Sequence, residues 1–201
     1  MKRALAFVLA CVLGGCAPAA RVPLESFQSL SSGEMVLVGR VELVPPLRKG
    51  EQRVRGIVVG DVENKMFLIA DERLRPLPQD PGISDYAGRI EAKLGDHFFV
   101  RSKSEPFYIL GGVLFLDIGG NSMQRIYFPG GLRVAAEPGD RAVYIGTLRY
   151  HRDEFFDISR VSVVDEYAEA SKEFAKRFGN GQRLKKALLT RAPQNERPNS
   201  R

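Results

Sequence analysis

The chain has few histidines and cysteines, and it lacks the common nucleophile and phosphate-binding motifs. It has two histidines and two cysteines among 201 residues, and the cysteines, Cys11 and Cys16, both lie near the amino terminus. Residues 17–201 therefore contain no cysteine for a disulfide, so a fold in this region must be stable through its core alone. No Gly-x-Ser-x-Gly motif occurs, and no Gly-Gly pair stands between a strand and a helix with the lysine of a phosphate-binding loop. These absences disfavour catalysis by a serine or cysteine nucleophile and nucleotide binding.

A long apolar run is also absent. The run near the amino terminus, Ala4–Val12, is shorter than the roughly 20 residues that a membrane-spanning helix needs. It follows Lys2 and Arg3 and precedes two glycines, which is typical of an export signal with a charged start, a short apolar centre and a small-residue cleavage site. An ordinary cleaved signal peptide fits this pattern, because Gly15 suits its cleavage site, and so does a lipidated one.

The residues Leu13-Gly14-Gly15-Cys16 resemble the lipobox of bacterial lipoproteins. The resemblance implies removal of residues 1–15, lipidation of the Cys16 sulfur, and acylation of the new amino terminus with chains such as palmitate. Each buried methylene contributes about 0.8 kcal/mol, so three chains make such an anchor effectively permanent. Ala17 is not the aspartate that resembles an inner-membrane retention signal in enteric bacteria. We therefore expect a cell outer membrane protein that faces the periplasm, with Cys16 as its lipidation site.

Charge is distributed unevenly along the chain. The net charge is +6, but residues 172–201 hold nine Lys or Arg against two acids, and residues 16–171 sum to −3. Nucleic acid is not an expected partner, because an exported chain rarely meets it and no aromatic-interleaved basic surface accompanies the tail. The basic tail favours contact with anionic lipid or a cell-wall polymer. A solvated helix face followed by a ragged chain end explains the same charges.

Alternating apolar residues predict a mainly β fold. In residues 35–44 one alternate set is apolar or glycine, and the other carries Arg40 and Glu42, which is the pattern of a half-buried strand. Turns rich in Gly and Pro separate further strand patterns, and strands do not alternate with helices. The pattern predicts an antiparallel β-sandwich or barrel-like domain over residues 33–164. The other predicted strands are Val54–Val59, Lys65–Ala70, His97–Arg101, Phe107–Asp117, Gln124–Phe128, Leu132–Ala136, Arg141–Tyr150 and Phe155–Val164.

Irregular segments flank and interrupt this domain. Residues 16–32 contain prolines and small residues without a steady period, so we expect a flexible tether between the lipid and the fold. Residues 73–88 contain three prolines and should form a long surface loop, either functional or merely an insertion.

A helical segment is predicted at residues 165–191. Asp165 can accept hydrogen bonds from the first backbone N–H groups, Tyr167, Phe174 and Phe178 share one face, and Gly179 is a natural terminator. A second short helical run is expected over Gln182–Thr190. The polar residues 192–201 are expected to form a disordered basic tail.

The two histidines are the candidate metal or catalytic residues. His151 begins a segment that offers one imidazole and the carboxylates of Asp153, Glu154 and Asp157 within seven residues, whereas His97 adjoins a single acid. This spacing matches no closed ligand set, and hairpin tips are ordinarily polar. The prediction is therefore no catalytic, cofactor or metal site. The alternative, a periplasmic metal-binding protein or hydrolase using His97 or His151, requires the histidines to fold near each other and near carboxylates.

These observations predict a non-catalytic binding or assembly module of the cell envelope. The expected partners are the membrane, through the lipid anchor at Cys16, and an envelope protein. Contact of the basic tail with anionic lipid or the cell wall is a further expectation.

Overall fold

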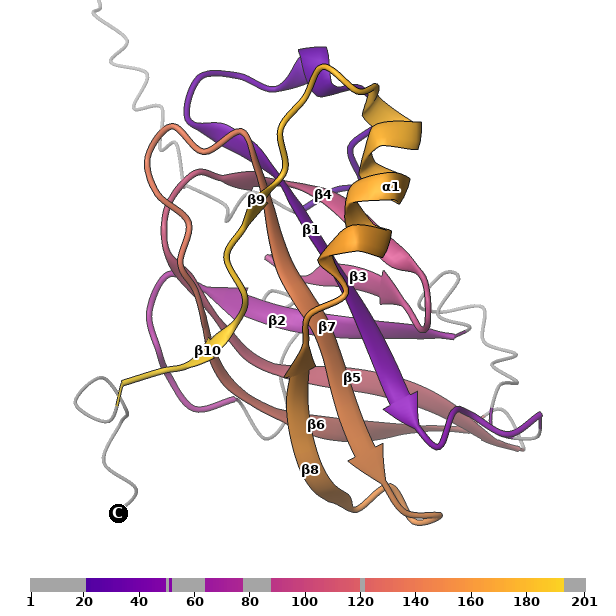
Figure 1. The fold of residues 1–201 in the computed structure, drawn as a ribbon. Coiled ribbons are helices and arrows are strands. Elements are labelled where there is room, and N and C mark those ends of the chain that lie inside the picture. The colour runs from indigo at the N-terminus through magenta and orange to yellow at the C-terminus, as the bar shows by residue number, and fades with distance from the viewer. Residues whose placement is uncertain (1–20, 50, 52–63, 78–87, 120–121, 194–201) are drawn as a thin grey trace, which may run out of the picture.

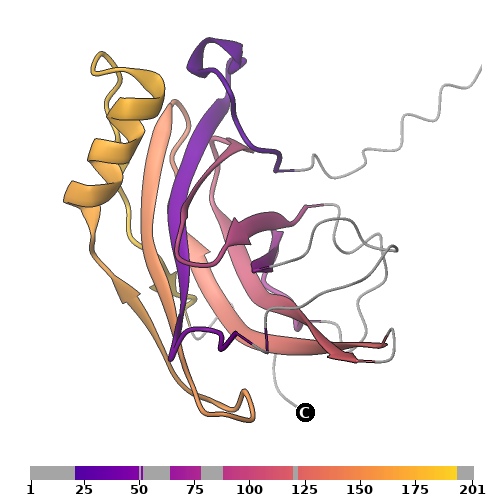
Figure 2. The same cartoon turned by 90° about the vertical axis from the view of Figure 1, so that its right-hand side faces the viewer.

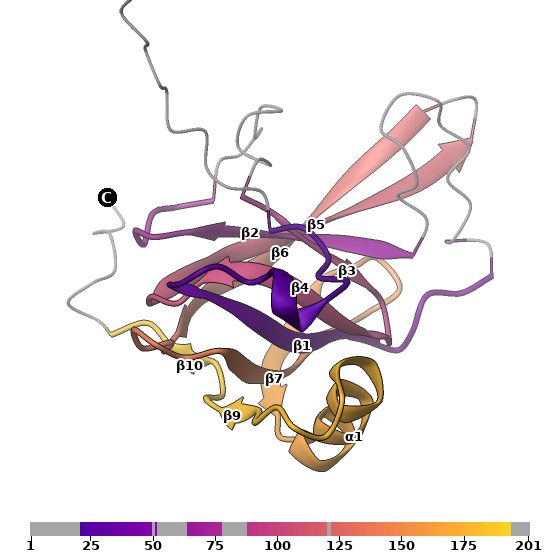
Figure 3. The same cartoon turned by 90° about the horizontal axis from the view of Figure 1, so that it is seen from above.

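A computed structural model of the chain describes residues 21–49, 51, 64–77, 88–119 and 122–193. These residues form two five-stranded sheets that stack face to face (Figure 1), which confirms the predicted mainly β, sandwich-like fold with a C-terminal helix. Viewed from above, the helix lies outside one sheet and the second sheet lies on the other side (Figure 3). No helix within the described ranges is long and apolar enough to cross a membrane.

The first sheet, called sheet I here, has the order β4-β1-β7-β8, and β9 pairs with β7 beside β8. Its central pair, β1 with β7, is parallel, as is β7 with β9, whereas the pairs of β1 with β4 and β7 with β8 are antiparallel. The parallel pairs depart from the predicted antiparallel arrangement. The strands of sheet I are β1 (Glu34–Val44), β4 (His97–Lys103), β7 (Ala142–Arg152), β8 (Ile158–Val164) and β9 (Lys185–Lys186).

The second sheet, sheet II, is antiparallel throughout and has the order β10-β6-β5-β2-β3. The predicted strands over 124–128 and 132–136 form one long strand here, β6, whose pairing with β5 shifts register near Pro129. Strand β3 had no counterpart in the sequence prediction, and the predicted strand Val54–Val59 lies outside the described residues. The strands of sheet II are β2 (Lys65–Asp71), β3 (Ile90–Lys93), β5 (Phe107–Gly119), β6 (Ser122–Val134) and β10 (Thr190–Arg191).

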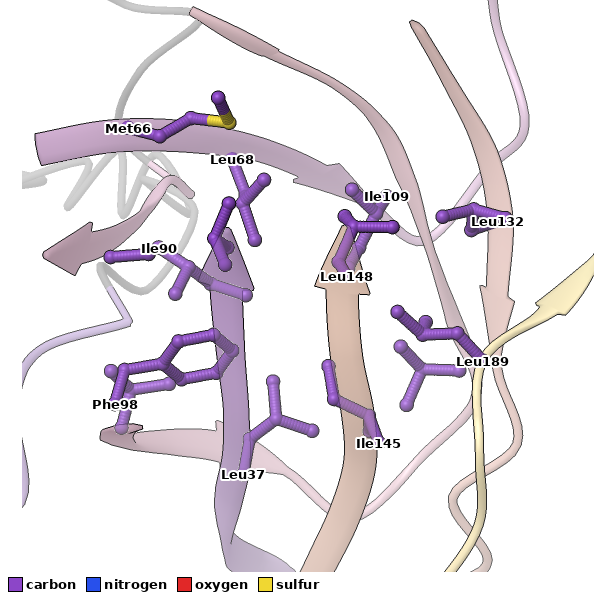
Figure 4. Packing of buried hydrophobic residues seen from close by; sticks show 14 of the residues in the cluster. Leu37, Met66, Leu68, Ile90, Phe98, Ile109, Leu132, Ile145, Leu148 and Leu189 are labelled. Atoms are coloured by element: carbon purple, nitrogen blue, oxygen red, sulfur yellow. The ribbon is translucent and has the colours of Figure 1, made fainter. Parts of the chain in front are cut away.

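The main core fills the space between the two sheets. Leu37 and Leu148 of sheet I point towards Leu68 and Ile109 of sheet II (Figure 4), and all four side chains are at most 1% exposed. The apolar alternate set of β1 faces this core, as its pattern predicted. Burying a side chain of this size contributes about 1.5–3 kcal/mol, so the core needs no disulfide.

The helix α1 (Tyr167–Phe178) covers the outer face of sheet I (Figure 2). Asp165 accepts a hydrogen bond from the Tyr167 N–H at 3.1 Å, and Gly179 ends the helix with a positive φ, both as predicted. Phe174 packs edge-on against Phe27 of a short 3₁₀ turn, η1 (Phe27–Ser29), with ring centroids 6.2 Å apart. The contact joins the helix to the amino-terminal part of the chain.

The prediction of a second helix over 182–190 is wrong. The segment is extended and crosses the edges of both sheets, with the Leu189 N–H bonded to the Ile145 carbonyl and the Ala192 N–H bonded to the Gly131 carbonyl. Its leucines are buried in two different clusters, Leu184 beneath α1 and Leu189 between the sheets. An extended chain reaches both clusters, which a two-turn helix cannot do. Ala192, predicted to begin a disordered tail, is buried; residues 194–201 lie outside the described residues.

The prediction of a flexible tether is wrong for residues 21–32. Residues 21–30, called the N-terminal strap here, lie against both sheets, and Leu24, Phe27 and Leu30 are buried. Tethering can therefore fall only to residues 16–20, which lie outside the described residues. Residues 78–87 of the predicted loop 73–88 also lie outside them.

Candidate functional site

The expected lipidation site, Cys16, lies outside the described residues. Residues 21–24 pair with the edges of both sheets. Arg21 pairs with Ile90 at the edge of β3, the Leu24 N–H donates to the Phe99 carbonyl at 2.8 Å, and the Arg101 N–H donates to the Val22 carbonyl at 2.9 Å. The N-terminal strap thus covers the outer edges of β3 and β4.

The structure does not bring the two histidines together. His97 pairs with Arg40 of β1, and Arg40 pairs with Thr147 of β7, which is four residues from His151 along the same strand. Two strand spacings and four residues place the backbones of the histidines about 16 Å apart. Within the described ranges, no three His, Cys, Asp or Glu residues lie together in a way that could hold a metal ion.

His97 lies half-buried beside a cation. Its Nε2 is buried and has no hydrogen-bond partner in the structure. Burial and the Arg40 guanidinium together lower the pKa of His97 below its ordinary value. The neighbouring positive charge opposes both protonation and the binding of a metal cation at this ring.

His151 accepts a hydrogen bond at Nε2 from the Arg160 guanidinium, 2.9 Å away, on the outer face of sheet I. Because a guanidinium only donates, this bond requires the neutral ring. Slight burial, Arg160 and Arg149 all lower the pKa of His151. The predicted carboxylates at this tip have a local role, since Asp153 Oδ1 accepts the N–H groups of Phe155 and Asp157 at 2.8 and 2.9 Å and shapes the turn.

A buried arginine, Arg152, anchors the hairpin that β7 and β8 form. The side chain of Arg152 is 1% exposed and its Nη2 lies 2.7 Å from Glu51 Oε2. The guanidinium also donates to the carbonyls of Pro45 and Pro46, at 3.1 and 3.0 Å. Burial raises the pKa of Glu51, but the hydrogen bonds from Arg152 and the Arg48 N–H outweigh it and hold the pKa below its ordinary value. The arrangement is that of a structural clamp.

A second charged cluster connects α1 to the outer face of sheet I. Glu42 lies 2.7 Å from both Arg40 and Arg149, and Glu166 accepts a hydrogen bond from Thr147 Oγ1 at 2.5 Å. Each carboxylate thus already has cationic or hydroxyl partners. These contacts connect the start of α1 to β1 and β7.

The sandwich has two seams where the edges of the sheets meet, and they differ. At the closed seam, β3 and β4 follow each other in the chain, and the strap lies over both edges. The open seam lies between β8 of sheet I and β6 and β10 of sheet II (Figure 1). Within the described chain β8 pairs with β7 alone, and residues 158–164 make no further backbone hydrogen bond.

A groove of about 700 Å³ runs along the open seam. One wall is formed by Ile158, Val161 and Val163 of β8, whose side chains are only partly buried. Leu132 and Leu189 form the opposite wall. A groove of this volume, with both apolar side chains and polar groups in its lining, is in the size range of ligand-binding sites in proteins.

Three arginines line the groove, and none of its sixteen lining residues is acidic. Arg75 is ion-paired with Asp71 at 2.6 Å, and Arg160 is bonded to His151. Arg191, on β10, makes no side-chain hydrogen bond or ion pair with the described residues, and its side chain is exposed. The groove therefore presents apolar walls with a positive rim.

The basic tail is partly neutralised by the fold. Lys185 bonds to Glu137 and Asp140 at 2.6 and 3.0 Å, and Lys186 bonds to Asp165 at 2.9 Å. These pairs hold the extended segment in place, which reduces the positive charge left for contact with an anionic surface.

The groove was missed in the sequence because it depends on pairing between distant segments. One indication was the alternation over residues 160–163, which predicts a half-buried strand without showing which neighbour it lacks. Another was the proline-rich loop 73–88, whose residues 74–77 line the groove. Comparison of the chain with protein-family models, with curated proteins and with solved structures finds no match.

Proposed function

We propose that the protein is a lipid-anchored, non-catalytic binding or assembly module of the cell envelope, and that the open seam is its binding surface. The observation that carries the proposal is the 700 Å³ groove, lined by apolar side chains and arginines, beside a strand edge that lacks a second neighbour within the described residues. The proposal is also consistent with the separation of His97 and His151 by about 16 Å.

The anchor is a separate part of this proposal, supported by the lipobox-like residues that end at Cys16. A Cys16→Ala variant should lose incorporation of labelled palmitate and should leave the outer-membrane fraction. Retention of both properties would contradict the anchor and leave the groove unaffected.

Site-specific photo-crosslinking in intact cells tests the binding surface. A benzoylphenylalanine at Val161 places the reactive group in the groove, and one at Lys176, on the exposed face of α1, is the matched control. We expect a discrete adduct from position 161 that position 176 does not give. Identical adduct patterns, or none from position 161, would contradict the groove as the binding surface.

A further inference from the structure

We propose that the open seam accepts an extended segment of an envelope protein as an added strand on β8, in which apolar residues alternate with acidic ones. The inference rests on the proposed function, because it names the partner class of the same groove. Strand addition supplies backbone hydrogen bonds for affinity and side-chain pockets for specificity.

The first argument is the uneven treatment of strand edges. The outer edges of β3 and β4 are covered by the strap, and β6 is paired with β10 at its end. Strand β8 has seven residues and no neighbour beyond β7 in the described chain. An edge of this length with free N–H and C=O groups is a template for pairing, which proteins otherwise tend to cover.

The second argument is the side-chain pattern of β8. Val161 and Val163 face the groove, whereas Arg160 and Ser162 lie on the outer face opposite His151 and Arg149 of β7. Side chains of an added strand would alternate in the same way. Apolar residues would face the two valines, and an acidic residue would lie opposite Arg160, where cross-strand pairs of opposite charge are favourable.

The third argument is charge. Arg75, Arg160 and Arg191 border the groove, Arg160 from the outer face of β8. No lining residue is acidic, and of the three arginines only Arg75 has a carboxylate partner among the described residues. Two positive charges thus remain to attract an acidic segment. A lipid acyl chain could use the apolar walls, but it could not pair with the free backbone groups of β8. The backbone edge therefore favours a peptide.

The test uses the full chain purified from membranes and a ten-residue peptide of alternating valine and glutamate. A second peptide has the same sequence with alternate backbone nitrogens methylated on the edge that would pair with β8. Methylation removes hydrogen-bond donors and leaves side chains and charge unchanged. We expect the first peptide to bind and to slow amide hydrogen exchange in β8, and the methylated peptide to bind at least about ten-fold more weakly.

Charge is tested by reversal. Arg160→Glu should weaken binding of the glutamate peptide about five-fold, and a valine–lysine peptide should regain that loss. Lys172→Glu makes an equal charge change on the exposed side of α1 and is the control. It should weaken binding of the glutamate peptide, or strengthen binding of the lysine peptide, only by the small effect of the change in net charge. Equal losses in both variants would contradict a contact at Arg160.

The outcomes separate the two proposals. Equal binding of the plain and methylated peptides, or binding of myristate but of neither peptide, would contradict strand addition. If an adduct forms at position 161 while no peptide protects β8, the groove remains a binding surface and strand addition is wrong. If neither an adduct nor peptide binding is found, both proposals are wrong.

Discussion

The closed and open seams are built from similar strands but end differently. At the closed seam Leu24 is 1% exposed, and the strap that carries it bonds to Phe99 and Arg101 of β4. At the open seam Val161 and Val163 of β8 remain partly exposed beside a groove. Apolar side chains are therefore buried at the closed seam and partly exposed at the open seam. Among the described residues, the fold covers the strand edges of one seam and leaves that of β8 uncovered.

The position of the strap adds to this contrast. Its residues follow the proposed anchor segment in the sequence, and they cover the edges of β3 and β4. The extended segment after α1 does the same for β7 and for the end of β6, through Leu189 and Ala192. Within the described chain, β8 is left without such a cover.

The largest expected effect is loss of stability at the closed seam. Leu24→Ala removes a fully buried side chain and should lower the free energy of unfolding by about 3 kcal/mol. Val161→Ala at the open seam should cost about 1 kcal/mol or less, because this side chain is already partly exposed. Urea unfolding of both variants measures the difference. Equal losses would show that the two seams are packed alike.

Arg152 should contribute nearly as much to the free energy of unfolding, because it fixes the hairpin of β7 and β8 to the residues that follow β1. Arg152→Ala removes charge-assisted hydrogen bonds to Glu51 and to the carbonyls of Pro45 and Pro46 and should lower the free energy of unfolding by about 2 kcal/mol at neutral pH. The same urea titration measures it. A loss no greater than that of Val161→Ala would contradict the clamp.

The Glu51 carboxylate should make this clamp sensitive to acid. Because the pKa of Glu51 is lowered in the fold, its contribution is present above the ordinary glutamate value of about 4.3 and is lost as the pH falls through the lowered value. Glu51→Gln should flatten this decline in a series of unfolding measurements. Glu154→Gln, at an exposed glutamate of the same region, is the control and should leave the decline in place.

His97 should give a smaller effect at the closed seam. Its pKa is lowered by burial and Arg40, despite the opposing charges of Glu166, Glu169 and Glu173. The unfolded chain therefore binds the proton first, and stability should fall as the pH drops below about 6.5 towards the lowered value. His97→Gln should remove part of this decline, and His151→Asn at the exposed outer face should remove less. The reverse order would contradict the burial assigned to His97.

The smallest effect on stability is expected at Arg160. Its side chain is exposed and, among the described residues, bonds only to His151, so Arg160→Glu should change the free energy of unfolding by no more than about 0.5 kcal/mol. The same variant should weaken peptide binding. A loss of binding without a loss of stability would show that Arg160 serves binding at the open seam and not the stability of the fold. A large loss of stability would assign Arg160 a structural role instead.

The sequence predicted a strand where apolar residues alternate with polar ones, because this pattern depends on the strand itself and not on which strands pair with it. The alternation in residues 35–44 correctly placed Leu37 in the core, yet Val36 and Val38 of the other set are also buried, beneath α1. Periodicity shows which residues share a face but not what covers that face. Leu184 and Leu188 have helical spacing, but Leu184 is buried beneath α1 and Leu189 between the sheets, and only an extended chain reaches both clusters.

The site was less predictable than the fold. The histidines were visible as candidates, but their separation depends on the register of β4, β1 and β7. The groove depends on which edge of β8 stays unpaired, and this is decided by the parallel pairing of β1 with β7, residues separated by about half the chain. Local propensity carries no information on such pairings.

Amide hydrogen exchange of the full chain tests the central claim most directly. The Arg101 N–H, bonded to Val22 of the strap, should be protected, whereas the N–H groups of β8 that point away from β7 should exchange rapidly. Adding the valine–glutamate peptide should slow exchange in β8 and leave Arg101 unchanged. Slow exchange along both edges of β8 before any peptide is added would contradict the open seam.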